Sequence, residues 1–220
     1  MNVTDIREME VMAVRELLAR PAIDVSRLEN TVGAILSEVR TGGDAAVRKF
    51  SLQFDKVAPE RLALSPEEMV VPLDEELKVA IRVAAGNIEK FHRSQLKEEP
   101  VIETIPGVRC WRKAVAIEKV GLYIPGGTAP LFSTLLMLAI PARIAGCREI
   151  VLCSPPDAQG RLHPALLYAA GLVGVTRVFR VGGVQAVGAM AYGTESIPAV
   201  YKIFGPGNQY VTCAKQLVQR

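Results

Sequence analysis

The sequence predicts an α/β protein in which a helical N-terminal segment and a β-hairpin precede a parallel sheet with helices on both faces. Two patterns lead to this fold class. The first part of the chain repeats apolar residues at helical spacing, whereas the part after the hairpin alternates short apolar runs, turns and helical patterns. Apolar residues make up 50% of the 220 residues, which is enough to bury a core in one or two domains.

Three segments are expected along the chain. They are an N-terminal helical arm over residues 1–20, a helix-rich segment with a hairpin over residues 21–118, which forms part of a first α/β domain, and a second α/β domain over residues 119–220. In the arm, Met9, Met12 and Leu17 recur at helical spacing until Arg20-Pro21 interrupts the pattern. The arm is therefore expected to hold one short amphipathic helix.

Four further helices are predicted in the second segment. Ser26–Glu29 reads as a capping box that opens the first of them, and Gly42-Gly43 stops it. The next helix is expected over Asp44–Phe54, capped by its first residue. Ser65–Glu68 supplies a cap and a proline for a short helix, and the longest helix follows over Leu73–Gln95 with one apolar stripe.

A strand pair and four strand-then-helix units complete the predicted order. The strand pair lies between Val101 and Trp111, with Pro106-Gly107 at its turn. The later strands are expected at about Lys119–Ile124, Glu149–Cys153, Arg177–Val181 and Val200–Phe204. The helices after them are expected at about Ala129–Ala145, His163–Val173, Gln185–Tyr192 and Asn208–Gln219. Such alternation predicts a parallel sheet with right-handed crossovers.

Charge, cysteine use and hydropathy exclude several classes of protein. Lys and Arg total 26 against 23 acidic residues, and this small excess is spread along the chain rather than concentrated as in a nucleic-acid binder. The four cysteines form no CxxC pair, which indicates reduced and buried thiols. No signal-peptide pattern opens the sequence, and the apolar run Leu131–Ala142 is too short to cross a bilayer. A cytoplasmic protein without nucleic-acid or membrane partners is expected.

Unusual turns are predicted to gather at one edge of the sheet, because the carboxyl ends of parallel strands meet there. They are Pro125–Gly127, Ser154–Pro156, Gly182-Gly183 and Gly205–Gly207. Glycines let backbone N–H groups approach a ligand, and helix N-termini favour phosphate. Beside these turns, Tyr123 can stack on a base, while Gln185 and Asn208 can donate and accept hydrogen bonds. One such turn is explained by loop geometry alone, but four together indicate a nucleotide-type ligand.

Other specific motifs are missing from the sequence. Gly205–Gly207 does not continue as GxGxxG, and Gly183–Gly188 does not end in the Lys-Ser/Thr of a P-loop. His92 and His163 are the only histidines, and neither has a metal ligand or nucleophile at a recognisable spacing. The acid pairs fall in helix first turns or solvated linkers. No catalytic and no metal-binding residue is therefore assigned.

Three long runs surround the predicted rim. They are VGLYIPGGTAPLFSTLLMLAIPARIAGC over Val120–Cys147, FRVGGVQAVGAMAYGTESIP over Phe179–Pro198, and KIFGPGNQYVTCAK over Lys202–Lys215. Together they resemble the histidinol dehydrogenase family, whose members close histidine biosynthesis. Further likeness lies in RPAID, the Gly42–Asp44 turn, Phe54–Lys56 and IPGVRC, so that the resemblance covers essentially the whole chain.

The resemblance implies a zinc-dependent oxidation of L-histidinol to L-histidine through histidinaldehyde, with NAD as the oxidant in two successive hydride transfers. It also implies an incomplete Rossmann-like sheet, which accounts for the missing glycine fingerprint. The residues that the resemblance assigns to the cofactor site are Tyr123, Gln185, Asn208, Gly126, Gly127, Gly205 and Gly207.

The family's chains are about twice as long as this one. The resemblance places the zinc ligands, the histidinol contacts and the catalytic Glu–His pair in the half that this sequence does not include. The sequence stops within the predicted helix Asn208–Gln219 without a glycine cap, which indicates a truncated chain. We therefore expect the chain alone to lack dehydrogenase activity and a native zinc site.

Two questions stay open at this point. The chain can be part of a dehydrogenase, or a naturally short ligand-binding or interaction protein that keeps the scaffold without catalysis. Genomic sequence immediately downstream distinguishes the two, because a reading frame that continues with a Glu–His pair and more histidines supports the dehydrogenase. The family forms intertwined homodimers whose contact includes the missing half, so the oligomeric state of this chain and the packing of its first helix stay open.

Overall fold

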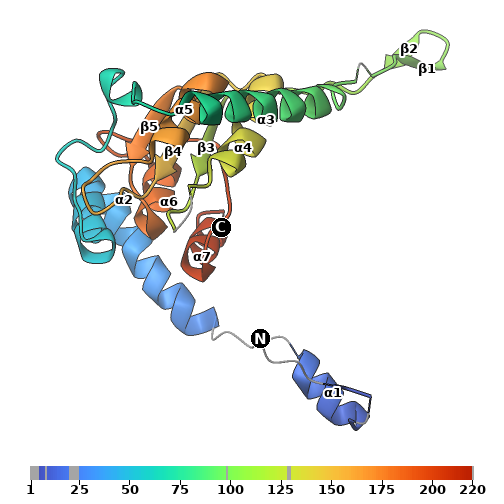
Figure 1. Cartoon of the computed structure of the whole chain (residues 1–220). Coiled ribbons are helices and arrows are strands. Elements are labelled where there is room, and N and C mark those ends of the chain that lie inside the picture. The colour runs from blue at the N-terminus through green and yellow to red at the C-terminus, as the bar shows by residue number, and fades with distance from the viewer. Residues whose placement is uncertain (1–4, 8, 20–24, 98, 128–129, 220) are drawn as a thin grey trace.

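The computed structural model describes residues 5–7, 9–19, 25–97, 99–127 and 130–219. The elements run in the order α1 (Val11–Leu18), α2 (Val25–Asp55), the short 3₁₀ helix η1 (Glu67–Met69), α3 (Glu75–Arg93), β1 (Ile102–Ile105), β2 (Val108–Cys110), β3 (Lys119–Tyr123), α4 (Phe132–Ile144), β4 (Glu149–Ser154), α5 (Pro164–Val173), β5 (Arg177–Arg180), α6 (Gly183–Tyr192), β6 (Lys202–Phe204) and α7 (Gln209–Leu217). This arrangement confirms the predicted fold class (Figure 1).

The central sheet has four parallel strands in the order β5-β4-β3-β6. Tyr123 pairs with Cys153, and Cys153 pairs with Phe179, so the strands β3, β4 and β5 end at the same edge. Along the chain, β4 pairs beside β3 and β5 beside β4, on one side of β3. The next strand, β6, pairs with the opposite side of β3. That reversal between β3 and β6 is the switch point at which ligands bind in open α/β sheets.

The segment before η1 covers the β5 edge of the sheet. Ala63 forms an isolated antiparallel bridge with Phe179. The N–H of Leu64 donates to the carbonyl of Val178 at 2.9 Å, and the N–H of Arg180 donates to the carbonyl of Leu62 at 2.9 Å. These bonds satisfy backbone groups that an edge strand would otherwise leave unpaired.

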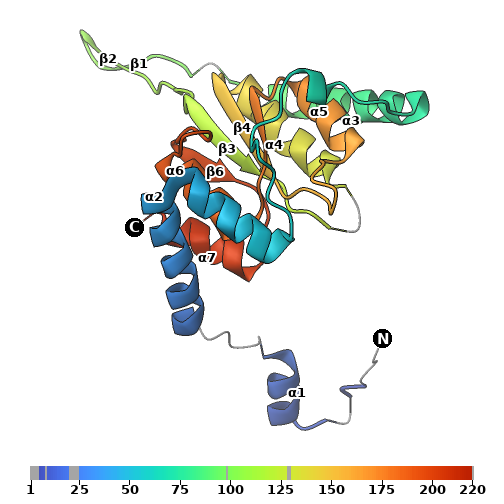
Figure 2. The same cartoon turned by 90° about the vertical axis from the view of Figure 1, so that its left-hand side faces the viewer.

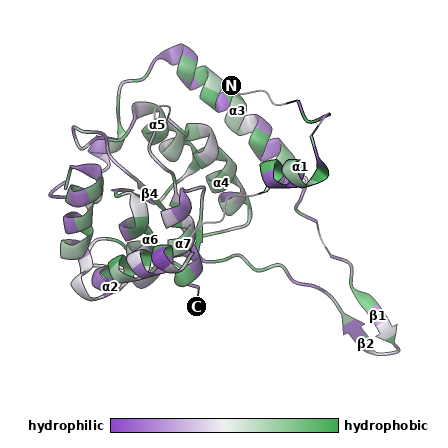
Figure 3. Cartoon of the chain, turned by 90° about the horizontal axis from the view of Figure 1, so that it is seen from below, coloured by the Kyte–Doolittle hydropathy of each residue, from purple (hydrophilic) through white to green (hydrophobic). Residues whose placement is uncertain are grey.

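Each face of the sheet buries its own core (Figures 1 and 2). Side chains alternate along β4, so that Val151 and Cys153 pack with α2, α6 and α7, while Ile150 and Leu152 pack with α3, α4 and α5. The helices α2 and α6 approach closely at Gly188, where a Cβ would lie 3.2 Å from side-chain carbons of the facing helix. In Figure 3, α3 alternates hydrophilic and hydrophobic residues, as expected for a helix with one buried face.

The two helices predicted before and after Gly42-Gly43 are continuous in the structure and form the single helix α2 (Val25–Asp55). The predicted break is present as a kink, because Gly43 has φ 53° and ψ −139°, outside the helical region. A Cβ at this position would also lie 2.4 Å from an oxygen of Glu195. Only glycine combines the positive φ with this close approach. The segment after the kink can therefore turn back onto the sheet.

The helix α1 and the β1–β2 hairpin lie away from the sheet (Figures 1 and 3). Within the described residues, α1 buries no side chain, and both hairpin strands are exposed along their length. Their exposed apolar residues include Leu18 at 70% and Trp111 at 63% exposure. The predicted helix stop at Arg20-Pro21 and the predicted helix start at Ala129 lie outside the described residues.

None of the four cysteines, all of which are described, forms a disulfide. The prediction that they are buried is confirmed for Cys153 and Cys213. It is wrong for Cys110, which is exposed because β2 belongs to the hairpin that extends from the body, and Cys147 is only partly covered. Among the described residues, no helix is both long and apolar enough to cross a membrane.

Candidate functional site

Two neighbouring hollows lie at the carboxyl ends of the strands. One has a volume of about 690 Å³ and lies at the switch point beside Tyr123 and Asn208; we call it the switch-point pocket. The other has a volume of about 720 Å³ and lies on the side of β4 and β5; we call it the edge pocket. Four residues line both of them, namely Pro125, Gly126, Pro155 and Pro156. The edge of the sheet at which the unusual turns were predicted to gather therefore carries two pockets, which share a proline-rich wall.

The switch-point pocket combines apolar walls with a few polar groups. Its lining residues are Thr31, Ile35, Phe54, Asp55, Tyr123, Pro125, Gly126, Pro155, Pro156, Gly183, Val184, Asn208 and Tyr210. Helix α2 supplies the first four of these, so one wall comes from a segment far from the sheet in sequence. Pockets of this size and lining are typical of small-molecule and cofactor sites.

Tyr123, the last residue of β3, is 4% exposed. Its phenol oxygen accepts a hydrogen bond from the N–H of Gly183 at 3.1 Å, at the start of α6. Burial is the main cause that raises the pKa of Tyr123, and the negative charge of Asp55 raises it further. The phenol is therefore protonated at neutral pH, and its O–H can donate to a ligand.

Gln185 lies behind the pocket wall rather than in it. Its side chain is fully buried in α6, and its Nε2 donates to Oδ2 of Asp55 at 3.3 Å. Its Oε1 is buried without a hydrogen-bond partner in the described part of the chain. Gln185 is therefore not among the residues that line the switch-point pocket, and its side chain bonds to Asp55, which is.

Asn208 caps α7 and lines the switch-point pocket. Its Oδ1 accepts the N–H of Val211 at 3.1 Å, which satisfies one of the unpaired donors of the helix start. The residue is exposed, so its amide nitrogen can reach a ligand in the pocket. The predicted pair of Tyr123 and Asn208 is thus brought together at one pocket.

The glycines after β3 are positioned differently from each other. Gly126 lines both pockets, and a Cβ there would lie 2.8 Å from the Pro155 ring. Gly127 lines only the edge pocket, and a Cβ there would have no neighbour within 4 Å among the described atoms. Gly126 is therefore required by packing against the shared wall, whereas Gly127 is not.

Gly205 and Gly207, which follow β6, are not among the residues that line the switch-point pocket. Gly205 has φ 133°, and a Cβ there would lie 2.0 Å from the carbonyl oxygen of Tyr123. A Cβ on Gly207 would lie 2.4 Å from the side chain of Val211. Lys215 holds the turn by donating from Nζ to the carbonyl of Gly205 at 2.5 Å. These glycines allow the turn to pack against Tyr123 and so shape the pocket indirectly.

Asp55 is the acidic residue among those pocket residues that the sequence did not single out. It is the last residue of α2, it is half-buried, and burial raises the pKa of its carboxyl group. An acid at a helix C-terminus opposes the helix dipole, so its presence there was a usable signal. Lys56 follows with φ 61°, a left-handed conformation that ends the helix.

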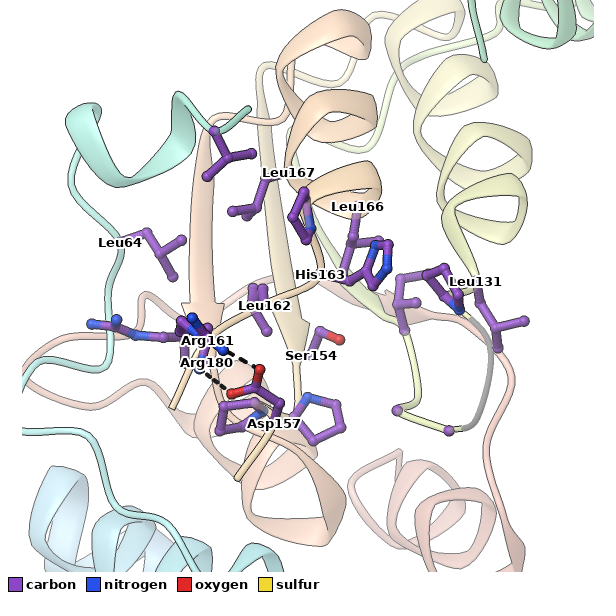
Figure 4. A pocket seen from close by; sticks show the side chains of 18 of the residues that line it. Leu64, Leu131, Ser154, Asp157, Arg161, Leu162, His163, Leu166, Leu167 and Arg180 are labelled. Carbon is purple, nitrogen blue, oxygen red and sulfur yellow. Dashed lines mark hydrogen bonds and ion pairs between the residues drawn. The ribbon is translucent and has the colours of Figure 1, made fainter. Parts of the chain in front are cut away.

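Arg180 lies at one side of the edge pocket, near Arg161 and Asp157 (Figure 4). Its guanidinium donates to Oε1 of Glu68 at 2.9 Å and to the carbonyl of Arg61 at 2.8 Å, and its Nε has no partner in the described residues. His163 caps α5 by accepting the N–H of Ala165 at its Nδ1, which confirms its predicted place at a helix start. The polar groups of this pocket mostly bond to one another.

The described residues do not fit a zinc site. Among them, no group of three or more His, Cys, Asp or Glu side chains gathers at one place. His92 lies in the last turn of α3, and its Nδ1 is 2.9 Å from Oε1 of Gln95, just after the helix. His163 caps α5. Protein zinc sites use three or four ligands of these types.

The fold and its pocket define a class of protein: a Rossmann-like α/β unit with a cofactor-sized hollow at its switch point. The family model for histidinol dehydrogenase matches residues 18–220, and the chain belongs to that family. It is 61% identical to histidinol dehydrogenase of Bacteroides thetaiotaomicron over 92% of this chain and 48% of that protein. It is 52% identical to that of Escherichia coli over 94% of this chain and 48% of that protein.

A solved structure shares the fold. The crystal structure of histidinol dehydrogenase from Elizabethkingia anophelis superposes with a TM-score of 0.89 at 46% identity, covering 96% of this chain and 49% of that one. The chain therefore spans about half the length of the relatives that it matches.

Proposed function

We propose that this chain is the cofactor-binding part of an NAD- and zinc-dependent L-histidinol dehydrogenase. The complete enzyme would oxidise L-histidinol to L-histidine through histidinaldehyde, in the last steps of histidine biosynthesis in the cytoplasm. The observation that carries the proposal is the 61% identity over 92% of this chain to a protein named histidinol dehydrogenase. The pocket at the switch point supports it, because dinucleotides bind at this place in Rossmann-like sheets.

The switch-point pocket fits the adenosine part of NAD. Phe54, Tyr210 and the proline wall offer apolar surfaces for a base, while Asp55, Tyr123 and Asn208 offer hydrogen-bonding groups. The buried Oε1 of Gln185 also lacks a partner in the described residues, as expected beside a site that a ligand completes. NAD, when bound, accepts the hydride; the residues of this chain bind it and orient it.

The zinc ion and the acid–base chemistry are assigned to residues outside this chain. The described His, Cys, Asp and Glu residues form no cluster that fits the metal. We propose that the zinc ligands, the histidinol contacts and the catalytic residues belong to the further half that the relatives have. The same half is proposed to contribute to a homodimer.

NAD titration of the ¹⁵N-labelled chain tests the cofactor site. We expect amide shifts at Tyr123, Gly126 and Gly183, and weaker binding in the Tyr123→Ala variant. Asn208→Ser keeps a capping oxygen and removes the amide, so it separates ligand binding from helix stability. Gln209→Ala, next to Asn208 and outside the pocket, is the matched control. Unchanged NAD binding in both pocket variants would refute the site.

Turnover is tested with the same purified chain. We expect no NADH from L-histidinol, NAD and zinc, because the described residues supply no zinc site. Formation of NADH by the 220-residue chain would contradict the assignment of catalysis to the other half.

A further inference from the structure

Asp55 is placed where a ligand in the switch-point pocket would meet it. The residue lines the pocket together with Tyr123 and Gly183, and it reaches the site from α2 instead of from the sheet. Its carboxylate accepts one hydrogen bond, from Nε2 of Gln185 at 3.3 Å. Within the described residues it forms no ion pair with a lysine or arginine. Lys56, its neighbour, directs its ammonium group to the carbonyl of Gln53.

This environment leaves the carboxylate short of donors. An ionised carboxylate has about four acceptor positions, and a half-buried one is costly unless they are used. A single bond of 3.3 Å uses one of them weakly. Burial raises the pKa of Asp55, which is the sign of a charge that the protein alone does not compensate. A ligand that presents two adjacent hydroxyl groups would supply the missing donors.

The other acidic side chains that line the two pockets, Glu68 and Asp157, already have partners. Glu68 accepts hydrogen bonds from the N–H of Ser65 and from Arg180. In the common dinucleotide-binding fold, an acid further along the same unit accepts hydrogen bonds from the ribose hydroxyls. The first acid after β4 in this chain is Asp157, which lines the edge pocket. Its Oδ1 accepts the N–H groups of Gln159 at 2.9 Å and Arg161 at 2.8 Å, which closes its own loop. Asp157 is therefore a turn residue, whereas Asp55 accepts one long hydrogen bond in the described part of the chain and keeps further acceptor positions for a ligand.

We infer that Asp55 binds the ribose hydroxyls of the adenosine half of the cofactor and selects NAD over NADP. The inference rests on the proposed NAD-binding function. A carboxylate accepts both hydroxyl protons of the ribose diol but repels a 2′-phosphate, which offers negative oxygens in place of a donor. Gln185 is then a positioning residue that holds Asp55 from behind. The end of α2 would then supply the ribose-binding acid that the common dinucleotide-binding fold carries elsewhere.

Binding constants for NAD and NADP, measured by calorimetry on the 220-residue chain, test the inference. We expect the unsubstituted chain to prefer NAD by about tenfold or more, and Asp55→Asn to reduce the preference to about threefold or less. Asp157→Asn is the matched control, with the same chemical change at the neighbouring pocket, and it should keep the original preference. Asp55→Ser is a second variant and should also reduce the preference for NAD. We expect this variant to fold, because it removes a negative charge from a helix C-terminus, where the helix dipole disfavours it.

The outcomes separate the inference from the function on which it rests. If the chain binds NAD with shifts at Tyr123, but both Asp55 variants keep the original NAD preference, the role of Asp55 is wrong and the cofactor site stands. If the unsubstituted chain binds neither dinucleotide, nor 5′-ADP as the smaller probe, the proposed cofactor function fails and the inference fails with it. A preference lost equally in Asp157→Asn would also overturn the assignment.

Discussion

The carboxylate of Asp44 accepts a hydrogen bond from the hydroxyl of Thr194 at 2.6 Å, which joins the kink of α2 to the loop after α6. The hydroxyl and N–H of Ser196 also donate to this carboxylate, and Arg48 lies 3.5 Å from it. In return, Glu195 accepts the N–H of Asp44 at 2.7 Å. These reciprocal bonds fix the start of the second half of α2 to the loop after α6, and the end of that half supplies Phe54 and Asp55 to the switch-point pocket.

Asp44→Ala should destabilise the protein by about 3 kcal/mol, because it removes a buried acceptor and leaves several partly buried donors without a partner. Urea unfolding at neutral pH measures the change. The control is Asp74→Ala, which removes an exposed cap of α3 and should cost about 1 kcal/mol. Equal losses for the two variants would show that the Asp44 contacts contribute no more than a helix cap.

The contribution of Asp44 should depend on pH. Burial by itself raises the pKa of Asp44, but the bonds from Ser196 and Thr194 and the charge of Arg48 together lower it below the ordinary value of 3.8. A lowered folded-state pKa gives stability that is present above 3.8 and is lost as the pH falls through the folded value. The stability difference from Asp44→Asn should therefore shrink in acid. A difference that is constant with pH would contradict the ionised role.

Gly205→Ala should disturb the turn beneath Tyr123. The added Cβ would meet the carbonyl oxygen of Tyr123 at 2.0 Å, and φ of 133° is unfavourable for alanine. We expect a loss of about 3 kcal/mol or more in urea unfolding. Gly127→Ala, whose Cβ has open space among the described atoms, should change stability by less than about 0.5 kcal/mol. Similar effects of the two substitutions would refute this distinction between the glycines.

Tyr123→Phe should cost about 1 kcal/mol, because the N–H of Gly183 loses its acceptor. Hydrogen exchange of the Gly183 amide should become faster in this variant. Tyr210→Phe is the control at the same pocket; Tyr210 is 43% exposed, and its loss of a hydroxyl should be nearly neutral. An unchanged exchange rate at Gly183 would argue against the hydrogen bond.

Lys56→Gly should stabilise the protein by about 1 kcal/mol, because a lysine with φ 61° has the left-handed conformation that glycine adopts without strain. Thermal unfolding measures the gain. Gln53→Gly, three residues earlier and within α2, should instead cost about 1 kcal/mol. A loss in both variants would mean that the side chain of Lys56 contributes more than its backbone strain costs.

The predicted sheet is confirmed because each strand carries a local signal, an apolar run followed by a glycine or proline turn. The break at Gly42-Gly43 was predicted for the same reason, although one kinked helix stands where two were expected. Side-chain direction has no such local signal. Gln185 was expected at the ligand, yet the first turn of α6 points it into the core. Asp55 was missed because a distant tertiary contact, the packing of α2 on α6, brings it to the pocket.

The packing of α2 also bears on the predicted boundary between residues 118 and 119. Val39 and Leu36 cover Gly188 of α6, and the other α2 residues complete the core on that face of the sheet. A gene segment that encodes only residues 119–220 would keep α6 and α7 on that face of the sheet, but it would lose the α2 part of the core and leave a pocket without Phe54 and Asp55. Helix α2 and residues 119–220 therefore share one core. Engineering that transplants the switch-point pocket into another protein has to carry this helix along.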